Sequence, residues 1–170
     1  MRDFFNLLAI LIIASVSLSA FFTVLSALFP KRTAKTRTVA DLMPGRAALV
    51  GFVNFLFFGA AGLTLLTLAN RVDNGLLKII LTLPALICLA LLFIGLSFGL
   101  TGVAQLAGAR IAPTRSDIAR VIVGTLALGW GSALPIVGWF LLLPYIGWLG
   151  LGAFIIGFFY RERPPTTDAL

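Results

Sequence analysis

The feature that most constrains this chain is a run without any charged residue, from Val121 to Tyr160. As one α-helix it would be about 60 Å long, roughly twice the thickness of the hydrocarbon core of a bilayer. The run also contains two adjoining copies of one pattern, "LPIVGWFLL" at Leu134–Leu142 and "LPYIGWLGL" at Leu143–Leu151. The chain is therefore predicted to double back inside this run.

Proline and glycine indicate where this reversal lies. Pro interrupts a helix, and Gly tolerates the backbone conformations that reverse it. The first copy supplies the favoured turn, while the proline of the second suits the first turn of the last helix. We predict a helical hairpin with its tip between Leu134 and Gly147, and the turn either in the first copy or near the second proline. The assigned turn residues are Pro135, Gly138, Pro144 and Gly147.

The composition indicates an integral membrane protein. Of the 170 residues, 60% are hydrophobic and 11% charged, whereas soluble domains carry about 25% charge. The charges gather between long apolar runs, which is typical of a polytopic membrane protein. The net charge of +7 falls in loops that meet lipid headgroups, so a nucleic-acid partner is not predicted.

We predict an all-α bundle of five membrane spans at residues 1–160, followed by a short polar tail at 161–170. The third run is longer than a span needs and is expected to tilt. Thr114, with Asp117 three residues later, predicts a capping box that starts the fourth span. The predicted spans are 4–29, 47–70, 79–109, 115–134 and 139–160.

The distribution of Lys and Arg favours five spans over four. With five, ten basic residues lie on one side and only Arg2, Arg71 and Lys78 on the other, whereas four spans give eight and five. The positive-inside rule prefers the larger asymmetry. The prediction is a bacterial cytoplasmic membrane protein with its amino terminus outside and its carboxyl terminus in the cytoplasm.

The first apolar run could instead be a signal peptide, because it ends in small residues. Its positive charge follows the apolar run, whereas the charge of a signal peptide precedes it. This order favours a retained first span.

The predicted spans lack the side chains that membrane enzymes use. The chain has no histidine, and its six acidic residues fall in loops, tails or helix starts. Nucleophilic serine needs a base, so Ser132 in "GWGSA" is interpreted as a helix-contact residue. Cys88 is interpreted as a small apolar side chain. No catalytic residue, metal site or cofactor is predicted, and the protein is expected not to be an enzyme.

Small residues at helical spacing predict helix-packing faces, since they let helices approach closely in lipid. One face lies on the first span and the other contains the GxxxG pattern "GLSFG". Asn54 and Gln105 are expected to bond neighbouring helices or, as the alternative, to line a permeation path. The packing residues are Ser15, Ser19, Thr23, Gly95, Gly99 and Gly102.

The loop "PKRTAKTRTVADLMPGR" is predicted to contact lipid headgroups. It could form a short interfacial helix with Val39, Leu42 and Met43 dipping inward. Each basic residue near an anionic leaflet contributes about 1 kcal/mol, although the charges could serve only to set topology. The residues assigned to headgroup contact are Lys31, Arg32, Lys35, Arg37 and Arg46.

The order of several motifs resembles a known membrane region. "LFP", "PGRAALVGFVNFLF", "GVAQLAGARI", "ALPIVGWFLLL" and "GLGAFII" follow one another between Phe21 and Phe158. This resembles the multi-span region of uncharacterised bacterial proteins that is sometimes attached to a bactofilin-type, polymer-forming domain. The resemblance implies a membrane bundle without catalytic residues; the glycine- and valine-repeating bactofilin domain itself is not found in this sequence.

Together these patterns predict a non-catalytic accessory or scaffold subunit. Its expected partners are membrane lipids and the helices of other integral membrane subunits or of a second copy. The alternative is a small-solute channel or transporter component with Asn54, Gln105 and Ser132 lining a path.

Overall fold

The computed structural model describes residues 2–134 and 136–160, and every regular element in these ranges is a helix. The predicted all-α class is confirmed. Pro135 and the predicted tail at 161–170, with its Arg161 and Arg163, lie outside the described residues. The elements are α1 (Arg2–Leu28), α2 (Pro30–Leu42), α3 (Pro44–Asn70), α4 (Gly75–Ile111), α5 (Asp117–Ser132), η1 (Gly138–Leu142) and α6 (Leu143–Phe159).

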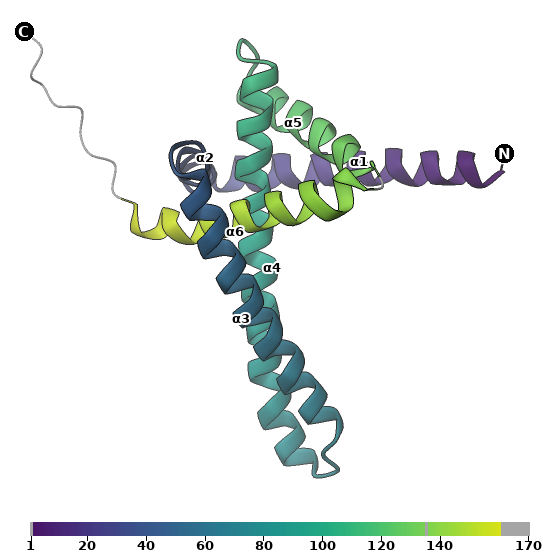
Figure 1. Cartoon of the computed structure of the whole chain (residues 1–170), viewed down its shortest axis with the longest axis vertical. Coiled ribbons are helices and arrows are strands. Elements are labelled where there is room, and N and C mark those ends of the chain that lie inside the picture. Colours follow the sequence, from purple (N-terminus) through teal and green to yellow (C-terminus); the bar gives the residue numbers. More distant parts are fainter. Residues whose placement is uncertain (1, 135, 161–170) are drawn as a thin grey trace, which may run out of the picture.

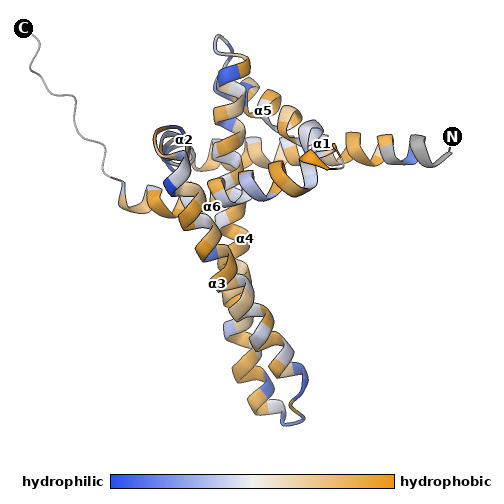
Figure 2. Ribbon diagram, in the orientation of Figure 1, coloured by the Kyte–Doolittle hydropathy of each residue, from blue (hydrophilic) through white to orange (hydrophobic). Residues whose placement is uncertain are grey.

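The helices α3 and α4 form a long antiparallel hairpin that α1 and α6 cross (Figure 1). The hairpin tip is polar, and the Asn74 side chain accepts a hydrogen bond of 3.1 Å from the Leu76 amide at the start of α4. Beyond the crossing, both helices are apolar over most of their surface (Figure 2). A helix that is apolar all round suits lipid contact, so this part of the hairpin is built for the membrane interior.

Glycines let α6 pass between α3 and α4. A Cβ at Gly152 would overlap the backbone of Ala47 and Gly51 in α3, and one at Gly150 would come 2.6 Å from the Gly99 carbonyl carbon in α4. Gly150 and Gly152 are two residues apart and therefore face opposite sides of α6. The last helix is thus held on two sides by the arms of the hairpin.

The same kind of contact joins α5 to the second half of α4. A Cβ at Gly124 would overlap the Ala104 carbonyl oxygen, and one at Gly108 would overlap the Arg120 carbonyl oxygen. These contacts draw the two helices together until their backbones touch. They use van der Waals contact, which is the attraction available between helices in lipid.

The start of α5 corrects the predicted cap. The helix begins at Asp117, and its cap is Ser116, whose Oγ accepts a hydrogen bond of 3.4 Å from the Ala119 amide. The predicted cap, Thr114, lies in a turn closed by the Arg115 amide on the Ala112 carbonyl at 3.2 Å, so it precedes the helix by too many residues.

Four helices are long and apolar enough to cross a membrane, which supports a multi-pass membrane protein. They are Leu8–Leu28, Pro44–Asn70, Gly75–Ile111 and Gly138–Phe159. The predicted fourth span corresponds to α5, whose 16 residues are about 24 Å long and do not reach the full hydrocarbon thickness unaided. The five-span count is therefore not met by helix length alone.

The chain turns between the end of α5 at Ser132 and the start of η1 at Gly138, at the first copy of the repeat. Gly138 already belongs to the returning helix, where a Cβ would come 2.5 Å from the Ser132 carbonyl oxygen. Pro144 lies in the first turn of α6, directly after a π-helical turn in which the Leu143 amide bonds the Gly138 carbonyl. Because proline crowds the carbonyl four residues before it, the wider turn keeps the helix continuous.

The segment α2 is a helix, as the interfacial-helix prediction stated. Its inner face is Thr33, Thr36 and Val39, all buried against α4 and α6. Leu42 is 60% exposed, and its insertion into the membrane stays a prediction. It comes three residues after Val39, at the point where α2 ends and the chain turns into α3.

Replacing Gly51 with Ala should destabilise the protein, whereas Gly59→Ala should not. A Cβ at position 51 meets the backbone carbonyl of Trp148, which cannot move without shifting α6; at position 59 nothing lies within 4 Å. Overpacking costs about 1–3 kcal/mol, and Gly→Ala in an open helix position gains up to about 1 kcal/mol. The melting temperatures of both variants are measured in detergent, with size-exclusion chromatography to detect the remaining folded protein after heating. Equal melting temperatures for the two variants would contradict the tight crossing.

Candidate functional site

The predicted glycine face of α4 makes contacts within the chain. Position 95 faces Leu151 of α6, position 99 faces Gly150, and position 102 faces the Thr36 side chain of α2. Gly95, Gly99 and Gly102 are all buried. These glycines are therefore occupied by the chain's own helices and are not free for a partner.

The predicted small-residue face of α1 is also turned inward. Ser15 and Ser19 are 7% and 8% exposed, and Ser15 lies beside Gly129 of α5. The Thr23 hydroxyl donates to the Ser19 carbonyl at 2.7 Å. The Ser19 hydroxyl oxygen is buried and has no hydrogen-bond partner among the described residues. The first span thus contacts α5 through small residues and leaves one polar atom unsatisfied.

The predicted headgroup residues separate into different environments. Lys31 and Arg46 are exposed, and Lys35 is half-buried beside Gly157. The Arg32 guanidinium lies over the Phe158 ring, 4.2 Å from its centroid, which ties α2 to the end of α6. Arg37 is half-buried and enters a cavity.

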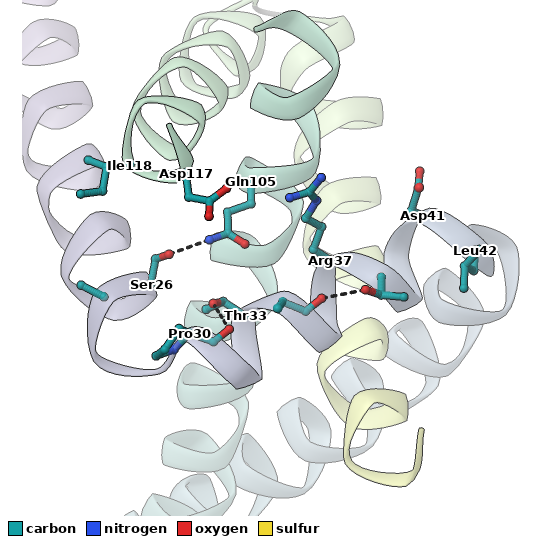
Figure 3. A pocket seen from close by; sticks show the side chains of 12 residues that line it. Ser26, Pro30, Thr33, Arg37, Asp41, Leu42, Gln105, Asp117 and Ile118 are labelled. Carbon is teal, nitrogen blue, oxygen red and sulfur yellow. Dashed lines mark hydrogen bonds between the residues drawn. The ribbon is translucent and has the colours of Figure 1, made fainter. Parts of the chain in front are cut away.

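That cavity has a volume of about 460 Å³ and lies where α1 turns into α2, against α4 and the start of α5 (Figure 3). Such a volume falls within the range of about 300–1,000 Å³ that small-ligand sites occupy. We call it the polar pocket. Its polar lining residues are Ser26, Thr33, Arg37, Thr38, Asp41, Gln105 and Asp117.

A hydrogen bond between two predicted spans forms the inner wall of the polar pocket. The Gln105 side-chain amide donates to the Ser26 hydroxyl at 2.6 Å, and Gln105 is only 8% exposed (Figure 3). The bond joins α4 to α1, as predicted for a polar side chain near a span. Asn54, the other such residue, donates to the Val50 carbonyl of its own helix at 2.8 Å.

Two ion pairs involve the acidic residues of the pocket. Arg110 donates to Asp41 at 2.8 Å, and Arg120 donates to Asp117 at 3.0 Å. In the described part of the chain, no carboxylate lies within ion-pair distance of Arg37. The pocket therefore offers one guanidinium free to bind an anion, with neutral hydrogen-bonding groups deeper inside.

The sequence singled out Arg37 and Gln105 as polar groups but did not bring them together. Ser26, Asp41 and Asp117 were missed as members of one site. Their contact depends on the corner between α1 and α2, at Phe29 and Pro30, which periodicity does not define. The Pro30 that ends one helix and starts the next was the only available signal.

The three residues of the alternative permeation path lie apart. Gln105 lines the polar pocket, and Ser132 lines a different, apolar cavity between α1, α5 and α6. Asn54 lies half-buried on α3. The fold does not bring them to one cavity within a single chain.

The bond between Gln105 and Ser26 should contribute measurably to stability. Polar pairs between membrane helices are worth about 0.6 kcal/mol on average and up to about 1.7. We expect a coupling energy in this range from a double-mutant cycle of Gln105→Leu and Ser26→Ala, measured by thermal or chemical unfolding in detergent. Purely additive effects would show that the two side chains do not interact.

No family model, curated protein or solved structure matches the chain. The resemblance to the membrane region attached to bactofilin-type domains accordingly stays a prediction.

Proposed function

We propose that this protein is a non-catalytic accessory or scaffold subunit of the bacterial cytoplasmic membrane that packs against the transmembrane helices of another protein. The observation that carries the proposal is the first half of α1, which projects beyond the other helices (Figure 1). Ile10 and Ile13 on this segment are 67% and 66% exposed. The small-residue faces of α1 and α4 are already used inside the chain, so we assign the partner contact to this projecting segment.

Two physical features support a contact with helices and not with substrates. The described spans contain no charged side chain away from their ends, so an intramembrane reaction lacks acids and bases. The projecting part of α1 has an apolar length that suits a helix-to-helix contact in lipid, where packing drives association.

We infer five crossings, with α5 as the fourth. In Figure 1, α2 and the end of α6 lie at the left and the α4–α5 turn at the top, whereas the hairpin tip lies at the bottom and the start of α1 and the end of α5 lie toward the right. A bilayer between these two sets separates the basic residues as the positive-inside rule requires. The normal of this bilayer is nearly parallel to the axis of α5 and oblique to the axes of the other spans.

The order of the helix lengths supports this placement. A helix along the membrane normal needs the fewest residues, and α5, with 16, is the shortest of the five. A tilted helix needs more, and α3 and α4 have 27 and 37 residues. We infer that the amino terminus lies outside and the end of α6 in the cytoplasm.

Single cysteines in a Cys88→Ala background test the topology. Thr114→Cys and Tyr160→Cys should react with a membrane-impermeant thiol reagent only from the cytoplasmic side, whereas Asn74→Cys and Ile136→Cys should react only from outside. With four crossings, Ile136→Cys would label on the same side as Thr114→Cys, and Tyr160→Cys on the opposite side. That pattern would reject α5 as a crossing.

Site-specific photocrosslinking tests the partner. A photoreactive residue at Ile13 should give a discrete adduct with another membrane protein in intact cells, identified by mass spectrometry. The matched control is the same residue at Ile80, equally apolar and 55% exposed on the hairpin, which should react with lipid. Solute flux in proteoliposomes of this chain alone, without an adduct at position 13, would favour the channel alternative over the scaffold.

A further inference from the structure

An apolar groove between α1 and α5 leads into the polar pocket. Val16, Ala20 and Val24 of α1 face Ile122 and Leu126 of α5 across a cavity of about 480 Å³. One turn further along both helices, Ala27 and Ile118 line the polar pocket. The positions on each helix are three or four residues apart, so they share one face and form one continuous groove.

The groove has the length of one lipid chain in one leaflet. Val16 to Ala27 covers about 16 Å of helix, close to half of the 30 Å hydrocarbon thickness. The polar pocket lies at the end where α1 meets the basic helix α2. The headgroup of a lipid would therefore lie in the polar pocket, and its acyl chain would lie along the apolar part of the groove.

Ser19 adds no accessible polar atom to the wall of the groove. Its side chain lines the groove and is 8% exposed, but its hydroxyl oxygen is covered by other protein atoms. The groove wall is therefore apolar at this depth, which suits an acyl chain.

The charges of the polar pocket match a zwitterion. Arg37 lacks an ion partner and can bind one phosphodiester, with the Ser26 hydroxyl and the Gln105 amide beside it (Figure 3). Asp117 is 76% exposed at the mouth and can accept a second cation besides Arg120. An anionic headgroup without an amine would offer Arg37 the same phosphodiester but no cation to Asp117.

We propose that the groove between α1 and α5 binds one phospholipid with a primary-amine headgroup. Its phosphate is bound by Arg37, its ammonium by Asp117, and one acyl chain lies between Val16 and Ala27. The site goes beyond the scaffold function and does not depend on it, because the groove uses the second half of α1 and the proposed partner contact uses the first.

Native mass spectrometry of the delipidated full chain in detergent tests the headgroup. Phosphatidylethanolamine and phosphatidylglycerol with identical acyl chains are added separately, and the lipid-bound fraction is measured. Phosphatidylethanolamine should bind at least fivefold tighter. Equal binding or a preference for phosphatidylglycerol would overturn the assignment of the headgroup.

Variants test the residues. Arg37→Gln should weaken phosphatidylethanolamine binding about tenfold or more, as expected for a lost hydrogen bond to a charged group, whereas Arg46→Gln outside the pocket should not. Asp117→Asn should remove the preference for the amine while binding persists. Equal affinities of the Arg37 and Arg46 variants would overturn the site.

A second pair tests the chain groove. Ala20→Phe fills the groove and should abolish the bound lipid, whereas Ala14→Phe, exposed on another face of the same helix, should leave it. Melting temperatures of both variants separate loss of lipid from loss of fold. Retained lipid in a folded Ala20→Phe protein would overturn the proposed location.

Discussion

The passage of α6 between the arms of the α3–α4 hairpin determines where the other helices can lie. It depends on backbone contact on two opposite faces of one helix, through Gly150 against Gly99 and Gly152 against Gly51. In lipid, helices gain little from hiding apolar surface, so stability comes from such close approach. The helix α2 packs across the end of α6, and the polar pocket lies where α1, α2, α4 and the start of α5 meet.

The helices themselves could be predicted from the sequence, because apolar length and Pro/Gly punctuation report directly on membrane helices. The predicted limits 47–70 and 139–160 lie within three residues of the helices that the structure contains. The tilt of the helices and the points where they cross could not be predicted. They depend on which glycines of different helices contact each other, and hydrophobic periodicity does not identify the helix that packs against a given face. The start of α5 was placed too early because the turn at Pro113 and Thr114 competes with the cap that Ser116 provides.

The candidate site was predictable only in part. Arg37 and Gln105 are recognisable in the sequence because they are polar side chains next to long apolar runs. Ser26 and Asp117 become part of the site only because the chain turns between α1 and α2 at Phe29 and Pro30. The glycines were recognised as packing residues, but their partners within the chain were not. The small residues of these faces are buried inside the fold, whereas many large apolar side chains are exposed on the outside.

The position of α6 also has a consequence for assembly on the ribosome. The hairpin that encloses α6 is translated before it, so α3 and α4 emerge while the element between them does not yet exist. The parts of α3 and α4 around Gly51 and Gly99 must stay apart, or separate again, before α6 can insert between them. Maturation of this protein is therefore coupled to completion of its last helix, and nascent chains halted before Gly138 would display an unfilled cleft to the insertion machinery.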